Sequence, residues 1–86
     1  METTPPQFVN ESQNEFVDID SEDYRIYTFA KEGNMYVVRI DGPLKLGVSP
    51  SGGHRIFDAS GVSHYIPPGW IELKWKAKPG KPNFVK

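Results

Sequence analysis

Apolar and polar side chains alternate along residues 70–78, which is the clearest periodic pattern in the chain. A period of two places successive residues on opposite faces of a β-strand. One predicted face is apolar and consists of Ile71, Leu73, Trp75 and Ala77; the other carries Trp70, Glu72, Lys74, Lys76 and Lys78. The pattern predicts a strand that covers a core with its apolar face and presents cations to solvent. In this register Trp75 is expected to be largely buried.

Six further segments alternate in the same way or are rich in β-branched and aromatic residues, as strands are. They are residues 15–20, 24–30, 35–40, 44–48, 54–58 and 62–66. The segment 24–30 carries large side chains on both faces, which predicts a central strand. The turn at residues 31–34 contains a glycine and predicts a hairpin between this strand and residues 35–40. In residues 35–40 the alternation separates two sets, of which the first is Tyr36, Val38 and Ile40 and the second is Met35, Val37 and Arg39.

Short strands separated by frequent turn signals predict an all-β fold, either a small antiparallel barrel or a two-sheet sandwich of six to seven strands. The connections are short, and short connections favour antiparallel pairing. Asp41-Gly42-Pro43 is expected to interrupt pairing, because proline supplies no backbone donor. We expect one small domain over residues 14–78, a disordered tail over residues 1–13 and a basic tail over residues 79–86.

The absence of cysteine and of long apolar segments limits how this domain is stabilised and where in the cell we expect it. The 86 residues include no cysteine, so neither disulfides nor a thiolate metal site contributes to stability. No apolar run reaches about 18 residues, and the N-terminal sequence lacks the pattern of a signal peptide. We therefore expect a soluble, cytoplasmic protein that does not associate with membranes.

The charge of the chain is divided unevenly between its two halves. Residues 1–43 carry three basic and nine acidic side chains, a net charge of −6, whereas residues 44–86 carry seven basic and two acidic side chains, a net charge of +5. The total of −1 argues against indiscriminate binding of nucleic acid. A local basic surface in the C-terminal half remains compatible with this total.

The candidate binding residues are Trp70, Lys74, Lys76, Lys78 and Arg55. Lysines neutralise phosphates, and an exposed aromatic ring can stack on a base. The row Lys74, Lys76 and Lys78 beside Trp70 therefore predicts one class of function, a nucleic-acid-binding barrel. Lysines on an outward or edge strand are also a common means of keeping a sheet soluble and unpaired. The same aromatic and charged side chains suit a protein-binding surface as well.

A second candidate site lies where residues 54–58 and 62–66 are expected to pair. Such a hairpin would bring His54, Asp58 and His64 near one another, and these residue types ligate metals or transfer protons. Their spacing matches no established metal-binding pattern, so we predict neither a metal nor another cofactor.

Taken together, these patterns favour a non-enzymatic β-domain that binds a protein partner through an aromatic and charged sheet face and modulates a larger enzyme or complex. Nucleic-acid binding through the row Lys74, Lys76 and Lys78 is the alternative, and a small metal or acid–base site at His54, Asp58 and His64 is the third hypothesis. An exposed sheet edge that pairs with its own copy would also make the protein a homodimer.

Overall fold

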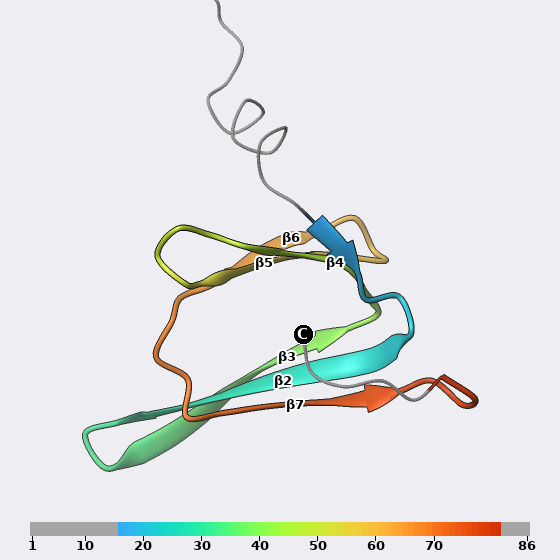
Figure 1. The fold of residues 1–86 in the computed structure, drawn as a ribbon. Helices are drawn as coiled ribbons and strands as arrows, with labels where there is room; N and C mark the ends of the chain where they lie inside the picture. The colour runs from blue at the N-terminus through green and yellow to red at the C-terminus, as the bar shows by residue number, and fades with distance from the viewer. Residues whose placement is uncertain (1–15, 82–86) are drawn as a thin grey trace, which may run out of the picture.

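The computed structural model describes residues 16–81 and contains two antiparallel sheets packed as a sandwich (Figure 1). The all-β prediction is confirmed, and of the two predicted architectures the structure has the two-sheet sandwich, with seven strands. The four-stranded sheet has the order β1-β4-β5-β6, formed by β1 (Phe16–Asp18), β4 (Pro43–Val48), β5 (His54–Asp58) and β6 (Ser63–Ile66). The three-stranded sheet has the order β3-β2-β7, formed by β3 (Asn34–Asp41), β2 (Glu22–Lys31) and β7 (Glu72–Ala77). The predicted tail over residues 1–13 lies outside the described residues, as do residues 82–86 of the predicted C-terminal tail. Over residues 16–81, no helix has the length and hydropathy needed to cross a membrane.

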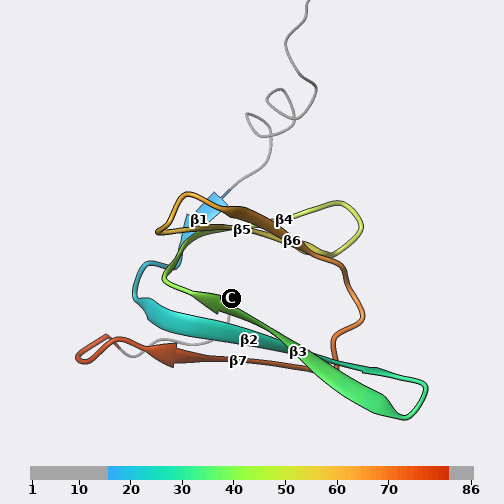
Figure 2. The same cartoon turned by 180° about the vertical axis from the view of Figure 1, so that it is seen from behind.

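The predicted hairpin between β2 and β3 is present, and β2 is the central strand of its sheet. Its two turn residues, Glu32 and Gly33, have φ values of 52° and 81°, as a tight two-residue hairpin turn requires. Ile40 is buried and Val38 packs against the core, whereas Met35 and Val37 are exposed on the opposite face, as the alternation predicts. The turn end of this hairpin extends beyond the four-stranded sheet in both views (Figure 1 and Figure 2).

Between β3 and β4 the chain crosses from the three-stranded sheet to the four-stranded sheet over a single residue, Gly42. Gly42 has φ of 61°, and a Cβ atom there would lie 3.2 Å from the Cβ of Ala59. Both observations favour glycine at this corner. The expected interruption at residues 41–43 is shorter than predicted, because Pro43 already belongs to β4 and is paired with Asp58.

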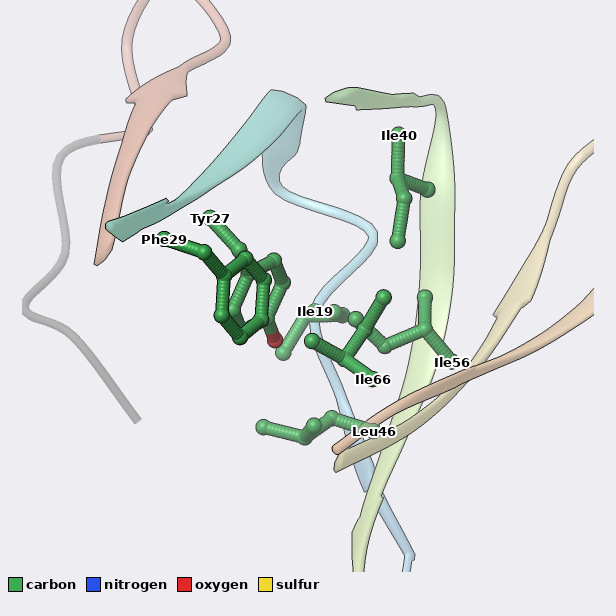
Figure 3. Close-up of a cluster of buried hydrophobic side chains, with 7 residues drawn as sticks. All are labelled: Ile19, Tyr27, Phe29, Ile40, Leu46, Ile56 and Ile66. Carbon is green, nitrogen blue, oxygen red and sulfur yellow. The ribbon is translucent and has the colours of Figure 1, made fainter. Parts of the chain in front are cut away.

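The core lies between the two sheets and draws on both of them (Figure 3). Its buried hydrophobic residues are Ile19, Tyr27, Phe29, Ile40, Leu46, Ile56 and Ile66. Val38, Trp70 and Leu73 are partly buried and pack against this cluster. Tyr27 and Phe29 come from the central strand β2, so the three-stranded sheet contributes its largest side chains at its middle.

The predicted alternation holds within β7 but fails at its start. Lys74 and Lys76 are exposed, while Leu73 is partly buried against the core. Residues 70 and 71 precede the strand, and there the expected faces are exchanged: Ile71 is 60% exposed, whereas Trp70 packs against the core. The prediction for Trp70 was wrong because a period of two applies only within a paired strand. Trp75 is half-buried rather than largely buried.

Candidate functional site

A β-bulge places two charged side chains inside the sandwich. The register of β2 against β7 shifts between Glu22 and Tyr24, so Glu22 and Arg25 face the same side although they are three residues apart. Both side chains are almost completely buried. Nε and Nη2 of Arg25 donate hydrogen bonds to the two carboxylate oxygens of Glu22, at 2.9 and 2.7 Å. This bidentate geometry is the one that best offsets the desolvation cost of a buried ion pair.

Two further groups extend this pair from one sheet to the other. Nη1 of Arg25 donates to the hydroxyl oxygen of Tyr27 at 3.0 Å, and the Tyr27 hydroxyl lies 2.6 Å from Nδ1 of His54 on β5. Because a guanidinium can only donate, the Tyr27 hydroxyl accepts from Arg25 and donates its own hydrogen to Nδ1, which places the proton of the neutral imidazole on Nε2. We call the four residues Glu22, Arg25, Tyr27 and His54 the buried chain.

Trp70 packs beside the buried chain and not on the outer side of the sheet that carries Lys74 and Lys76. Its ring lies edge-on to Tyr27, with centroids 4.9 Å apart, and its centroid is 4.6 Å from that of His54. On the three-stranded sheet, the Arg25 guanidinium lies 5.4 Å from the ring centroid of Trp75. Two tryptophans therefore pack around the buried polar groups and limit their contact with water.

The environment moves three pKa values of the buried chain away from neutrality. Burial disfavours the charge of Arg25, but hydrogen bonds to Glu22 and Tyr27 outweigh it and raise the pKa of Arg25. Burial also raises the pKa of Tyr27, against the opposing effect of Arg25. Burial and, secondarily, the charge of Arg25 lower the pKa of His54. At neutral pH, Arg25 is therefore charged while Tyr27 and His54 are neutral.

Asp58 and His64 form a separate pair at the β5–β6 turn. Oδ1 of Asp58 accepts hydrogen bonds from the backbone N–H and hydroxyl of Ser60 and from the N–H of Val62, at 2.8–3.0 Å. Oδ2 lies 2.7 Å from Nε2 of His64. The bond to His64, followed by those from Val62 and Ser60, holds the pKa of the Asp58 carboxyl well below its usual range. The carboxylate thus fixes the turn between the two strands.

The expected grouping of His54, Asp58 and His64 is only partly present. The predicted hairpin does form, and it brings Asp58 to His64, but the ring of His54 contacts Tyr27 and Trp70 instead. Within residues 16–81, no three His, Asp or Glu side chains are arranged to hold a metal ion.

Exposed aromatic side chains gather on the outer side of the four-stranded sheet. Cα partners across the strands run Phe16, Gly47, Arg55 and Tyr65, from β1 to β6. Directly opposed residues of antiparallel strands project from the same face. Phe57, two residues after Arg55 on β5, projects from that face as well. Phe16, Phe57 and Tyr65 are 37%, 42% and 52% exposed, so each ring offers surface to a partner. We call Phe16, Arg55, Phe57 and Tyr65 the aromatic face.

Two local contacts hold the rings of the aromatic face in place. A Cβ atom on Gly47 would lie 2.7 Å from the ring of Phe16, so the absence of a side chain there lets this ring lie against the sheet. The hydroxyl of Tyr65 lies 2.8 Å from that of Ser51, which in turn lies 2.9 Å from that of Ser49. These hydroxyls, Ser51 foremost, lower the pKa of Tyr65, and the charge of Arg55 adds to the effect. The rings of Phe16 and Tyr65 are therefore held in place by the domain itself, and a preorganised surface loses less entropy on binding.

The five candidate binding residues lie at three separate places. Trp70 packs against the core, and Arg55 belongs to the aromatic face. Lys74 and Lys76 lie on the outer side of the other sheet, opposite Ile26 and Tyr24, and Lys78 follows the end of β7. Among the described residues, none of the three lysines has a carboxylate within ion-pair distance.

Neither a protein family, nor a curated protein, nor a solved structure matches this chain.

Sequence reasoning did not find the buried chain or most of the aromatic face. Alternation within residues 54–58 and 62–66 does place Arg55, Phe57 and Tyr65 on one side, so that signal was available. The position of Phe16 depends on pairing between β1 and β4, which are far apart in sequence and separated by a complete hairpin. The inward position of Glu22 depends on a bulge, for which the residues themselves give no local signal.

Proposed function

We propose that this domain is a non-enzymatic binding module that docks a protein partner on the aromatic face. The observation that carries the proposal is the row of opposed residues across the four-stranded sheet, in which Arg55 lies between Tyr65 and the Phe16 ring over Gly47. Tyrosine and arginine are enriched among the few residues that dominate the binding energy of protein interfaces, and phenylalanine is enriched at interfaces generally. A partner that fits this row presents a carboxylate to Arg55 and apolar side chains to Phe16 and Phe57.

Charge favours a protein segment over a nucleic acid at this face. Lys45, which lies on the same side of the sheet, is neutralised by an ion pair of 2.6 Å with Asp18. The chain carries a net charge of −1, which gives no long-range attraction for a polyanion. One arginine among aromatic rings suits a single carboxylate with apolar neighbours better than a row of phosphates.

The alternative, nucleic-acid binding through Lys74, Lys76 and Lys78, lacks the exposed aromatic ring on which a base would stack. It requires an exposed Trp70 beside the lysines, whereas Trp70 packs against Tyr27 and His54. The lysines remain solvated on the opposite side of the sandwich from the aromatic face, where they also protect the free edge of β7.

The non-enzymatic part of the proposal is supported by the hydrogen bonds of the titratable groups. His54 and Tyr27 bond to each other inside the sandwich, and Asp58 bonds to four donors of its own turn and its neighbouring strand. In these contacts the groups hold the two sheets and the β5–β6 turn together. We propose that the module acts through its surface and modulates a larger cytoplasmic enzyme or complex to which it binds.

The experiment that tests this proposal compares two charge reversals on opposite sides of the sandwich. The tagged full chain is used to capture partners from the native cell, and each captured protein is then purified and titrated directly. Arg55→Glu should weaken the direct interaction by about 30-fold or more, since interface arginines of this kind contribute about 2 kcal/mol or more. Lys74→Glu is the matched control and should leave the affinity within about twofold of the wild type.

Two results would overturn the proposal. One is loss of the purified partner with Lys74→Glu and not with Arg55→Glu, which would move the interface to the three-stranded sheet. The other is saturable binding of a labelled single-stranded oligonucleotide at about 50 mM salt, with affinity falling as salt rises. Circular dichroism of both variants establishes that each is folded.

A further inference from the structure

The three-stranded sheet has a long free edge at β3. Among the described strands, β3 has β2 on one side and no neighbour on the other. Its eight residues pair with β2 without any register shift, so no bulge twists the edge away from solvent. Its exposed apolar side chains are Met35 at 66%, Tyr36 at 51% and Val37 at 59%.

The hairpin turn determines which backbone groups point out from this edge. In a two-residue hairpin the pair that closes the turn, here Lys31 and Asn34, exchanges hydrogen bonds. Hydrogen-bonded and non-hydrogen-bonded pairs then alternate along the strands. The N–H and C=O groups that face outward therefore belong to Met35, Val37, Arg39 and Asp41.

The N-terminal half of β3 lacks the features that protect the other edges. The edge strand β7 carries Lys74 and Lys76, and lysine on an edge opposes pairing with another strand. The edge strands of the other sheet, β1 and β6, have only three and four residues. The stretch Met35-Tyr36-Val37 carries neither a charge nor a proline, and an exposed apolar edge of this kind is prone to pair with another chain.

We propose that β3 pairs antiparallel with β3 of a second copy of this chain, with Val37 opposite Val37 across a two-fold axis. The outward N–H and C=O groups of Met35, Val37 and Arg39 allow this register, because they meet outward N–H and C=O groups of the same three residues in the second copy. Side chains then match: Val37 meets Val37, and Met35 meets the aliphatic part of Arg39. On the inward face, Tyr36 meets Val38.

Registers shifted towards Asp41 match less well. A shift that brings Arg39 opposite Arg39 places like charges together, which destabilises a strand pair. The intermediate register sets Val37 against Arg39 and Met35 against the carboxylate of Asp41, which removes the contact between the two valines. The proposed pairing joins the two three-stranded sheets into one continuous sheet of six strands and uses the same surface on both copies. It leaves the aromatic face free, so it is independent of the proposed docking function.

Oligomeric state tests the pairing directly. Light scattering coupled to size exclusion should show a dimer of the full chain, and Val37→Lys should convert it to a monomer by placing two ammonium groups opposite each other. Ile71→Lys is the matched control, because Ile71 is equally exposed and lies outside β3; this variant should remain dimeric. A wild type that stays monomeric at high concentration, or a Val37→Lys variant as dimeric as the control, would refute the pairing.

The absence of natural cysteine allows the register to be tested by cross-linking. Directly opposed residues of a hydrogen-bonded pair have Cα atoms about 5.5 Å apart, within the range that a disulfide spans. Val37→Cys should therefore oxidise to a covalent dimer, whereas Met35→Cys, which faces Arg39 of the second copy, should not. Cross-linking at position 35 without cross-linking at position 37 would contradict the register. Arg55→Glu should leave both readouts unchanged, which separates this inference from the docking function.

Discussion

Replacing Tyr27 by phenylalanine removes one oxygen atom from the middle of the buried chain. The ring and its contact with Trp70 remain, but Nη1 of Arg25 and Nδ1 of His54 lose the hydroxyl that bonds to both. Arg25 and His54 are buried, so water does not readily take the place of the hydroxyl. Each buried polar group left without a partner costs about 1–3 kcal/mol, so the two groups together give a loss of about 2–6 kcal/mol in the free energy of unfolding.

This loss is large compared with the stability of a small domain. Single domains have an unfolding free energy of about 5–15 kcal/mol, and domains of this size lose about 4–8 °C of Tm for each kcal/mol. We therefore expect Tyr27→Phe to lower Tm by about 10 °C or more. Urea unfolding followed by tryptophan fluorescence measures the change in free energy, since Trp70 lies against the altered ring.

Tyr36→Phe provides the control for loss of a tyrosine hydroxyl. Tyr36 is half exposed, its ring stacks on Phe29, and its hydroxyl has no hydrogen-bond partner among residues 16–81. This substitution should change the unfolding free energy by less than about 0.5 kcal/mol. If Tyr27→Phe were equally mild, the buried chain would not contribute to stability through its hydroxyl and the reasoning would be refuted.

Two further predictions concern pH and the C-terminal strand. Folding lowers the pKa of His54 from its ordinary value of 6.5, so in mild acid the unfolded chain binds more protons than the folded chain. The free energy of unfolding should therefore be highest above about pH 6.5 and should decline as pH falls towards 5, before the carboxyl groups titrate. Thermal melts between about pH 7.5 and 5 measure this slope, which His54→Gln should flatten; a wild-type Tm that is constant over this interval would contradict the prediction. Trp75→Ala should cost less than the roughly 3–5 kcal/mol typical of a fully buried aromatic side chain, because Trp75 is half-buried. Urea titration of this variant would contradict the described position of Trp75 if the loss reached that full range.

Local patterns predicted those parts of the fold that depend on neighbouring residues. The hairpin of β2 and β3 followed from alternation on either side of a turn that contains glycine, and the exposed positions of Lys74 and Lys76 followed from alternation within β7. Trp70 was misplaced because the paired strand begins two residues later, at Glu72, and the linking segment turns the tryptophan inward.

Long-range pairing accounts for what the sequence did not predict. The buried chain needs both a bulge in β2 and the approach of β5 from the other sheet, and neither leaves a periodic signal. The aromatic face needs β1 to align with β4 so that Phe16 meets Gly47. Arg55 was the one candidate residue that the structure places on this face, since its outward position follows from alternation within a single strand.

The position of β2 between β3 and β7 has a consequence for how the domain folds. β2 can pair with β3 as soon as residue 41 is available, but its other edge waits for β7, whose Lys76 pairs with Tyr24. During synthesis, β2 therefore keeps an open edge until nearly all of the described chain has left the ribosome. Contacts between segments so distant in sequence slow folding, because the closure of a long loop precedes any gain from pairing. We therefore expect the charged groups of Glu22 and Arg25 to stay accessible to water until β7 pairs with β2, and to become buried late in folding.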